Sequence, residues 1–135
     1  MIWFIMEPGE LRPREEPFRA CGCCGQVWQS WEDFVLDPGL RLLGLQANGV
    51  LPDANLLVFE HRCGSSVSVL TSRFRQLLPD SQEASALPSL RGTEQCSGHC
   101  SSLENLEQCD RPCINARDRR LILHVMGMKR QANMS

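Results

Sequence analysis

The sequence predicts an α+β protein in which a small antiparallel β module is followed by a helical module stapled by four cysteines. Valines alternate with serines over residues 66–70, the period of a half-buried strand. Residues 114–128 instead carry an apolar stripe at helical spacing. The eight cysteines fall in two groups on either side of residues 79–95, a stretch rich in Ser, Pro, Gly and Glu that is typical of a linker.

The hydrophobic residues are spread unevenly. They make up 42% of the 135 residues, an ordinary share for a globular protein. They are dense over 34–78 and sparse over 79–109, so we expect the core to come mainly from the first half. A second half without a core of its own needs an additional constraint, such as a bound metal ion or disulfides. We therefore divide the chain into an N-terminal tail (1–18), a β module (19–78), a linker (79–94), a paired-cysteine helical module (95–130) and a C-terminal tail (131–135).

The β module is expected to start with a short strand at 26–28. Ser30, followed three residues later by Asp33, resembles a helix N-cap with an acidic first turn and predicts a short helix over 31–36. Asp37-Pro38-Gly39 ends this helix.

Three further strands are expected. The apolar runs 40–47 and 56–61 are separated by turn sequences, Asn48-Gly49 and Pro52-Asp53, and predict two antiparallel strands. The strand at 66–70 follows Cys63-Gly64. A short helix capped by Thr71 or Ser72 is expected to continue to Leu78.

The C-terminal segment is predicted to be helical from Ile114 to Met128, with Pro112 near its start, where a first-turn proline is tolerated. This part of the chain has six basic residues but only two acidic ones, Asp110 and Asp118. The simplest interpretation is a solvated helix face, and a basic patch is the alternative. The six are Arg111, Arg117, Arg119, Arg120, Lys129 and Arg130.

Charge and cysteine content indicate a cytoplasmic protein. The formal net charge of −2 gives no overall attraction to nucleic acid or to acidic membranes. The apolar run at 1–6 lacks a basic flank and is far shorter than the roughly 20 residues that span a bilayer, so we expect neither a signal peptide nor an anchor. In the cytoplasm cysteines stay reduced, and clustered reduced cysteines are more often metal ligands than disulfide partners.

The first cysteine group has metal-ligand spacing. In Cys21-x-x-Cys24-Gly25 a tight turn aims two thiolates at one ion, and the glycine permits positive φ. The sequence His61-Arg62-Cys63-Gly64 supplies a second pair before a strand. We expect Cys21, Cys24, His61 and Cys63 to hold a zinc ion. Glu60 is the alternative fourth ligand, but imidazole suits a closed structural zinc site better than carboxylate.

These motifs resemble those of zinc ribbons over residues 19–78, although one residue rather than two separates His61 from Cys63. The wider pattern, from Trp31 through Leu43-Gly44-Leu45-Gln46 and Phe59–Gly64 to Gly92–Cys96, also resembles an uncharacterised family of small bacterial cysteine-rich proteins. That resemblance implies no activity. Cys23 is not assigned as a ligand of either cysteine group and is interpreted as a turn residue.

The second group has the symmetrical spacing Cys96-x3-Cys100-x8-Cys109-x3-Cys113. A spacing of four places both thiols of a pair on one side of a helical turn, so four thiolates can converge on a second zinc ion. An iron–sulfur cluster takes the same ligands, although its familiar runs have two intervening residues. In an oxidising compartment Cys96–Cys113 and Cys100–Cys109 disulfides would fit instead.

The sequence favours a non-enzymatic, zinc-stabilised interaction or accessory protein with a protein partner. It contains no Gly-rich phosphate loop, nucleophile elbow or two-histidine protease helix. His99 and His124 have no nucleophile or carboxylate partner set by spacing. An iron–sulfur electron-transfer accessory protein is the alternative function, and nucleic-acid binding through the basic C-terminal helix is the third.

Overall fold

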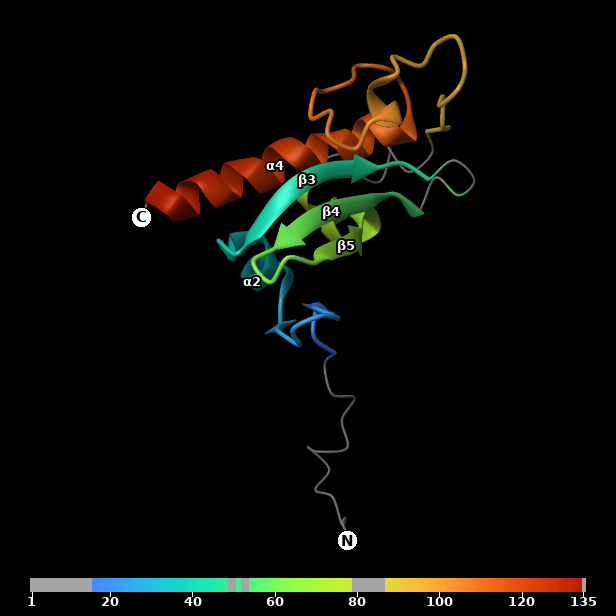
Figure 1. Cartoon of the computed structure of the whole chain (residues 1–135). Coiled ribbons are helices and arrows are strands. Elements are labelled where there is room, and N and C mark those ends of the chain that lie inside the picture. Colours follow the sequence, from blue (N-terminus) through green and yellow to red (C-terminus); the bar gives the residue numbers. More distant parts are fainter. Residues whose placement is uncertain (1–15, 49–50, 52–53, 79–86, 135) are drawn as a thin grey trace, which may run out of the picture.

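The computed structural model describes residues 16–48, 51, 54–78 and 87–134, and it confirms the α+β class (Figure 1). Two small antiparallel sheets precede a long C-terminal helix. Most of the expected N-terminal tail and half of the expected linker lie outside the described residues, as do Gly49, Pro52 and Asp53 of the turns.

The first sheet is a hairpin of β1 (Arg19–Ala20) and β2 (Val27–Trp28), and it encloses the first cysteine motif. Helix α2 (Trp31–Leu36) follows and has the expected bounds. The Ser30 hydroxyl caps it by accepting a 3.1 Å hydrogen bond from the backbone N–H of Asp33. This cap satisfies one of the donors that the first helical turn leaves free.

The second sheet has the order β3-β4-β5, and its strands match the expected apolar runs closely. Their bounds are β3 (Leu40–Gln46), β4 (Leu56–His61) and β5 (Ser66–Leu70). Val67 and Val69 on β5 are buried, as alternation predicts. The helix expected after β5 forms as a 3₁₀ helix, η2 (Thr71–Leu77).

Aromatic side chains build the centre of the core. The Phe34 ring on α2 lies 4.8 Å from Phe59 on β4 and 5.0 Å from Trp28 on β2, both edge-to-face. Phe18 and Phe74 pack on the same cluster. These contacts join both sheets and α2. They therefore fix the positions of the two hairpins that carry the first cysteine group relative to each other.

Helix α4 (Ile114–Met134) is longer than expected and takes in most of the expected C-terminal tail. It packs against β3, η2 and α2, with Leu121, Ile122 and Val125 inside the same core as the sheet. The sequence placed this helix in a separate module after a linker. Its apolar stripe is buried against the sheet because the polar segment before it offers little apolar surface.

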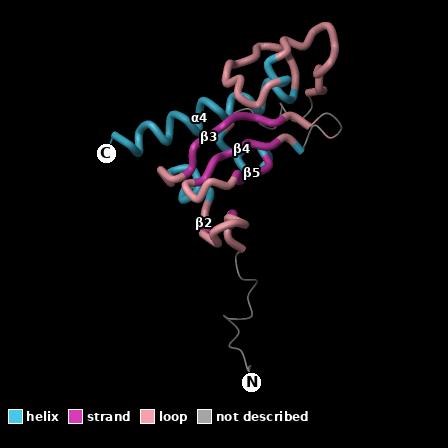
Figure 2. The backbone as a smooth tube through the Cα atoms, viewed as in Figure 1, coloured by secondary structure: helices cyan, strands magenta, loops and turns pink. Residues whose placement is uncertain are grey.

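Residues 87–113 form loops rather than the two helical turns expected around the second cysteine group (Figure 2). One 3₁₀ turn, η3 (His99–Ser101), interrupts them. The loop lies against the sheet at Gly44, where an added Cβ would come within 1.7 Å of the Leu103 carbonyl oxygen. Only a glycine permits this approach, so the position couples the loop to β3.

Two of the six C-terminal cations, Arg117 and Arg119, are buried and not on the solvated helix face that was expected for them. Arg117 pairs with the buried carboxylate of Asp118 at 2.9 Å. The Arg119 guanidinium donates to the Glu107 carbonyl at 2.7 Å and to the Asn105 carbonyl. The Arg117 side chain is therefore directed into the protein interior, and the Arg119 side chain is directed toward the loop at residues 105–107. Across the residues that the structure describes, none of the helices combines the length and hydropathy needed to traverse a lipid bilayer.

Candidate metal centre

Two hairpin turns carry the four residues of the first expected site. Between β1 and β2, the N–H of Gly25 donates to the Cys21 carbonyl at 3.0 Å. Between β4 and β5, the N–H of Gly64 donates to the His61 carbonyl at 2.8 Å. Both glycines have positive φ, +83° and +95°, which lets the chain curl around the thiols that precede them.

The ligand atoms of Cys21, Cys24, His61 and Cys63 all lie within 4.8 Å of one another, so this group could hold a metal ion. The two sulfurs of Cys21 and Cys63 are 3.6 Å apart. The His61 Nδ1 atom lies 3.2 Å from the Cys63 sulfur and 3.6 Å from the Cys24 sulfur. Cys21 and His61 are buried while Cys24 and Cys63 are exposed, so the cluster sits at the surface with one side closed.

His61 is held with Nδ1 toward the thiols by the groups around its ring. Its Nε2 lies 3.0 Å from the Gln26 side-chain oxygen, which can only accept, so Nε2 carries the proton and Nδ1 keeps its lone pair. The Trp28 ring packs edge-on against the imidazole at 5.1 Å. Gln26 is itself oriented by donating to Asp37 at 2.9 Å. Such outer hydrogen bonds typically orient a ligating histidine.

Glu60, the alternative fourth ligand, lies elsewhere. It pairs with Arg41 at 2.7 Å on the exposed side of the sheet. Adjacent residues of a strand point to opposite faces, so Glu60 and His61 cannot both face the thiols.

The surroundings of two of the three cysteine ligands, Cys21 and Cys63, favour thiolates. A hydrogen bond from the backbone N–H of Gln26 lowers the pKa of Cys24, but burial and the neighbouring thiols of Cys21 and Cys63 outweigh it and raise that pKa. The Ser65 hydroxyl, 3.3 Å from the Cys21 sulfur, and the backbone N–H groups of Cys24 and Cys23 lower the pKa of Cys21 to about 5. The same hydroxyl, 3.1 Å from the Cys63 sulfur, is the main cause that lowers the pKa of Cys63 to about 7. Thiolates are the form of cysteine that binds metals.

Cys23 is exposed and lies beside the cluster without joining it. Its contact with Cys63 is the main cause that raises the pKa of the Cys23 thiol above its ordinary value. Cys23 is therefore a fifth thiol adjacent to the four candidate ligands.

The second cysteine group is arranged more loosely. Its four thiols line one small cavity of about 10 Å³, but within the described part of the chain the first site is the one group of three or more potential ligands whose atoms all lie within 4.8 Å. Cys96, Cys100, Cys109 and Cys113 are free thiols in this structure, which contains neither of the two disulfides considered as an alternative for this group.

Each sulfur of the second group nonetheless has a polar neighbour. Backbone N–H groups of Leu90 and Gly98 donate to Cys113 at 3.2 Å and to Cys96 at 3.4 Å. The Ser97 hydroxyl lies 3.2 Å from Cys109. Arg119 donates to Cys100 at 3.8 Å, while burial raises the pKa of that thiol. Three of the four sulfurs thus accept hydrogen bonds from N–H donors, an arrangement that suits a thiolate centre.

His99 is engaged with other groups. Its Nδ1 lies 2.5 Å from the Ser97 hydroxyl, and its Nε2 lies 3.1 Å from the Glu107 carboxylate. Spacing did not predict this carboxylate partner. The Glu107 side chain is 77% exposed, so the three groups form a surface cluster, and His99 is not directed at the neighbouring thiols.

The supporting residues Gln26, Ser65 and Asp37 were not predicted from the sequence. Gln26 and Ser65 each lie two residues from a candidate ligand, which is the signal that could have indicated them. Asp37 caps the C-terminal end of α2, away from both ligand pairs in the sequence, and gives no such signal.

The fold and its Cys₃His cluster thus define an α+β protein with a candidate metal centre. Comparison with family models, curated protein sequences and solved structures gives no match to this chain, so its function is interpreted from its own residues.

Proposed function

We propose that this protein is a non-enzymatic accessory or interaction protein whose fold is stabilised by zinc bound to Cys21, Cys24, His61 and Cys63. The observation that carries the proposal is the spacing of the four ligand atoms. An ion bound tetrahedrally at about 2.3 Å from sulfur and 2.0–2.1 Å from nitrogen sets sulfurs about 3.8 Å apart and sulfur and nitrogen about 3.6 Å apart. The sulfurs of Cys21 and Cys63 are 3.6 Å apart, and the His61 Nδ1 atom lies 3.2–3.6 Å from the sulfurs of Cys63 and Cys24, which is close to these values.

The donor set supports zinc over harder cations. Thiolate and imidazole are the ligands of structural zinc sites, whereas magnesium and calcium prefer oxygen. Two hairpins, each giving two ligands, also resemble the arrangement of a zinc ribbon. Four protein ligands fill a tetrahedral site, which suits a structural role better than a catalytic one.

The second cysteine group is proposed as a four-thiolate zinc site. The N–H groups that donate to three of its sulfurs, and the Ser97 hydroxyl beside the fourth, support a thiolate centre. The same donors support the alternative function, electron transfer by an iron–sulfur cluster, because hydrogen bonds to the sulfurs tune its potential. Colour separates the two, since iron–sulfur proteins are brown and zinc is spectroscopically silent.

A cytoplasmic location and a protein partner complete the proposal. Eight free thiols persist in a reducing compartment. Nucleic-acid binding through α4 is disfavoured because Arg117 and Arg119, two of its cations, are buried and engaged.

Elemental analysis of anaerobically purified protein tests the proposal. We expect about two zinc ions per chain, one for each four-ligand set. His61→Ala should lose one ion while Glu60→Gln, its neighbour on the opposite face, should lose none. Cys109→Ser should lose the other ion. A metal content near zero with all cysteines in disulfides would contradict both the metal sites and the location.

A further inference from the structure

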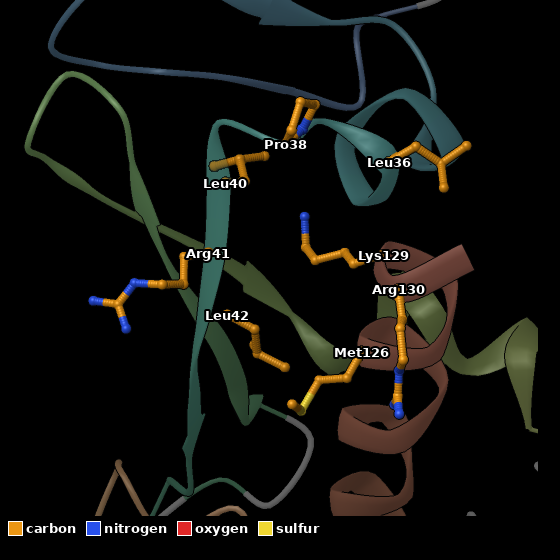
Figure 3. A pocket seen from close by; sticks show the side chains of 8 residues that line it. All are labelled: Leu36, Pro38, Leu40, Arg41, Leu42, Met126, Lys129 and Arg130. Atoms are coloured by element: carbon orange, nitrogen blue, oxygen red, sulfur yellow. The ribbon is translucent and has the colours of Figure 1, made fainter. Parts of the chain in front are cut away.

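A cavity of about 480 Å³ lies between β3 and the C-terminal half of α4, bordered by the turn after α2 (Figure 3). We call it the β3–α4 groove. Its volume is within the range of about 300–1,000 Å³ that is usual for small-molecule pockets. Its apolar lining consists of Leu36, Pro38, Leu40, Leu42 and Met126.

Exposed apolar surface gathers at this groove. Leu36 on α2 is 42% exposed and Met126 on α4 is 38% exposed, and both line it. Figure 3 shows Met126 and Leu42 directed toward each other across the space between α4 and β3. Leu36 and Met126, which come from separate helices, thus remain partly exposed to water beside the same cavity. A bound apolar group would remove them from water.

The groove also contains a half-buried cation. The Lys129 ammonium donates to the Asp37 carbonyl at 3.0 Å and lies 5.9 Å from the Phe59 ring centre. Burial lowers the pKa of Lys129 to about 8. The Asp37 carboxylate accepts instead from Trp28, Gln26 and Arg62. Among the described acidic side chains, none forms an ion pair with Lys129.

The remaining charges at the groove have the same sign. Arg130 lines it and is exposed. Arg41 also lines it, but it pairs with Glu60, and Figure 3 shows its side chain directed away from Lys129 and Arg130. No acidic residue belongs to the lining. The groove therefore combines an apolar wall with two cations, Lys129 and Arg130, whose charged ends Figure 3 shows directed to opposite sides of it. The nearby Asp37 carboxylate partly offsets the charge of Lys129.

We propose that the β3–α4 groove binds a small amphipathic anion, an aliphatic chain that ends in a carboxylate. The carboxylate accepts a hydrogen bond from Lys129, the chain lies on Leu40, Leu42 and Met126, and Arg130 adds positive charge at the other side of the groove. An ammonium withdrawn from water gains most from an anionic partner. The groove contains none of the candidate metal ligands, so this inference is independent of the proposed zinc sites.

The test is a titration of the full-length, metal-loaded protein with submicellar decanoate, followed by amide NMR shifts and calorimetry. Binding should shift the resonances of Leu42, Met126 and Lys129. Lys129→Met, which keeps the length of the side chain, should weaken binding about tenfold, since a charge-assisted hydrogen bond is lost. Arg111→Met, at the opposite end of α4, should leave the affinity unchanged.

Two further measurements keep the proposal falsifiable if Lys129→Met folds poorly. Met126→Glu places a carboxylate in the groove at an exposed helical position, and it should abolish binding by charge repulsion while the protein stays folded. Decanol, which has the same chain without charge, should bind more weakly than decanoate. Equal binding of decanol and decanoate, shifts confined to residues outside the groove, or no shifts at all would overturn the proposal.

Discussion

The indole Nε1 of Trp28 donates a 2.7 Å hydrogen bond to Oδ2 of Asp37. The same carboxylate accepts from Gln26, from the backbone N–H of Gly39 and from Arg62. Asp37 thereby ties the first hairpin to the turn before β3 and, through Gln26, supports His61. One carboxylate thus links the core to the candidate metal centre.

Asp37→Asn should lower the melting temperature, at a cost of roughly 1 kcal/mol for weakened charge-assisted hydrogen bonds. Burial alone would raise the pKa of Asp37, but hydrogen bonds from Trp28, Gly39, Arg62 and Gln26 outweigh it and hold that pKa below its ordinary value. The ionised carboxylate therefore contributes stability above pH of about 4, and this contribution disappears as the pH falls through the folded-state pKa.

Thermal melts of the wild type and Asp37→Asn at neutral pH and below pH of about 3 measure this effect. The gap in melting temperature should close at the lower pH, and the same comparison on metal-free protein separates the carboxylate's own contribution from metal release in acid. Asp110→Asn, an exposed carboxylate, serves as the control. A gap that stays constant with pH would contradict the assigned role.

Gln26→Leu should weaken metal binding about 10–100-fold without removing any ligand. The variant loses the acceptor that keeps the proton on Nε2 of His61, so Nδ1 is no longer held free for the ion. Competition with a chromophoric chelator measures the affinity. Gln29→Leu, an exposed residue of the same type, should bind metal as the wild type does. Equal affinities for both variants would show that the tautomer is fixed by other groups.

Cys63→Ser should destabilise the protein much more than Cys23→Ser. A structural zinc site contributes on the order of 10 kcal/mol of binding free energy in small zinc-folded peptides, and removing one of four ligands forfeits much of it. Melting curves and metal content of both variants check this expectation. If Cys63→Ser keeps its metal and only the double variant loses it, Cys23 takes over as the ligand. Equal melting shifts for the single variants would mean that the ligand set is wrong.

Asp118→Asn should cost about 3–5 kcal/mol of unfolding free energy, because it leaves the Arg117 charge buried without its partner. The carboxylate also accepts from Asn55 at 3.1 Å and from Thr71 at 2.7 Å, which joins α4 to the ends of β4 and β5. Urea unfolding measures the loss, with Asp110→Asn as the exposed control. A loss below about 1 kcal/mol would indicate that this network adds little beyond packing.

Much of the local structure was predictable from short sequence signals. The Ser30 cap, the alternation of Val67 and Val69, and the glycines after Cys24 and Cys63 each act within a few residues, so neighbours alone decide the conformation. The preference for His61 over Glu60 rested on ligand chemistry, and the period of two in the strand then allows only one of them to face Cys63. These are local rules of backbone geometry.

The sequence by itself determined strands β2 to β5, helix α2, the course of α4, the two cysteine groups and the spacing that suits a metal ion. It did not predict β1, and the helical turns that it predicted around the second cysteine group are loops. Tertiary structure alone decided that α4 lies in the common core, that Arg119 turns inward to the Asn105–Glu107 loop, and that Gln26 orients His61. The partners in these contacts are from 12 to more than 30 residues apart, and their choice depends on which apolar surfaces are left to bury once the sheet has formed. Burial of apolar surface is non-directional, so no local pattern specifies its partner.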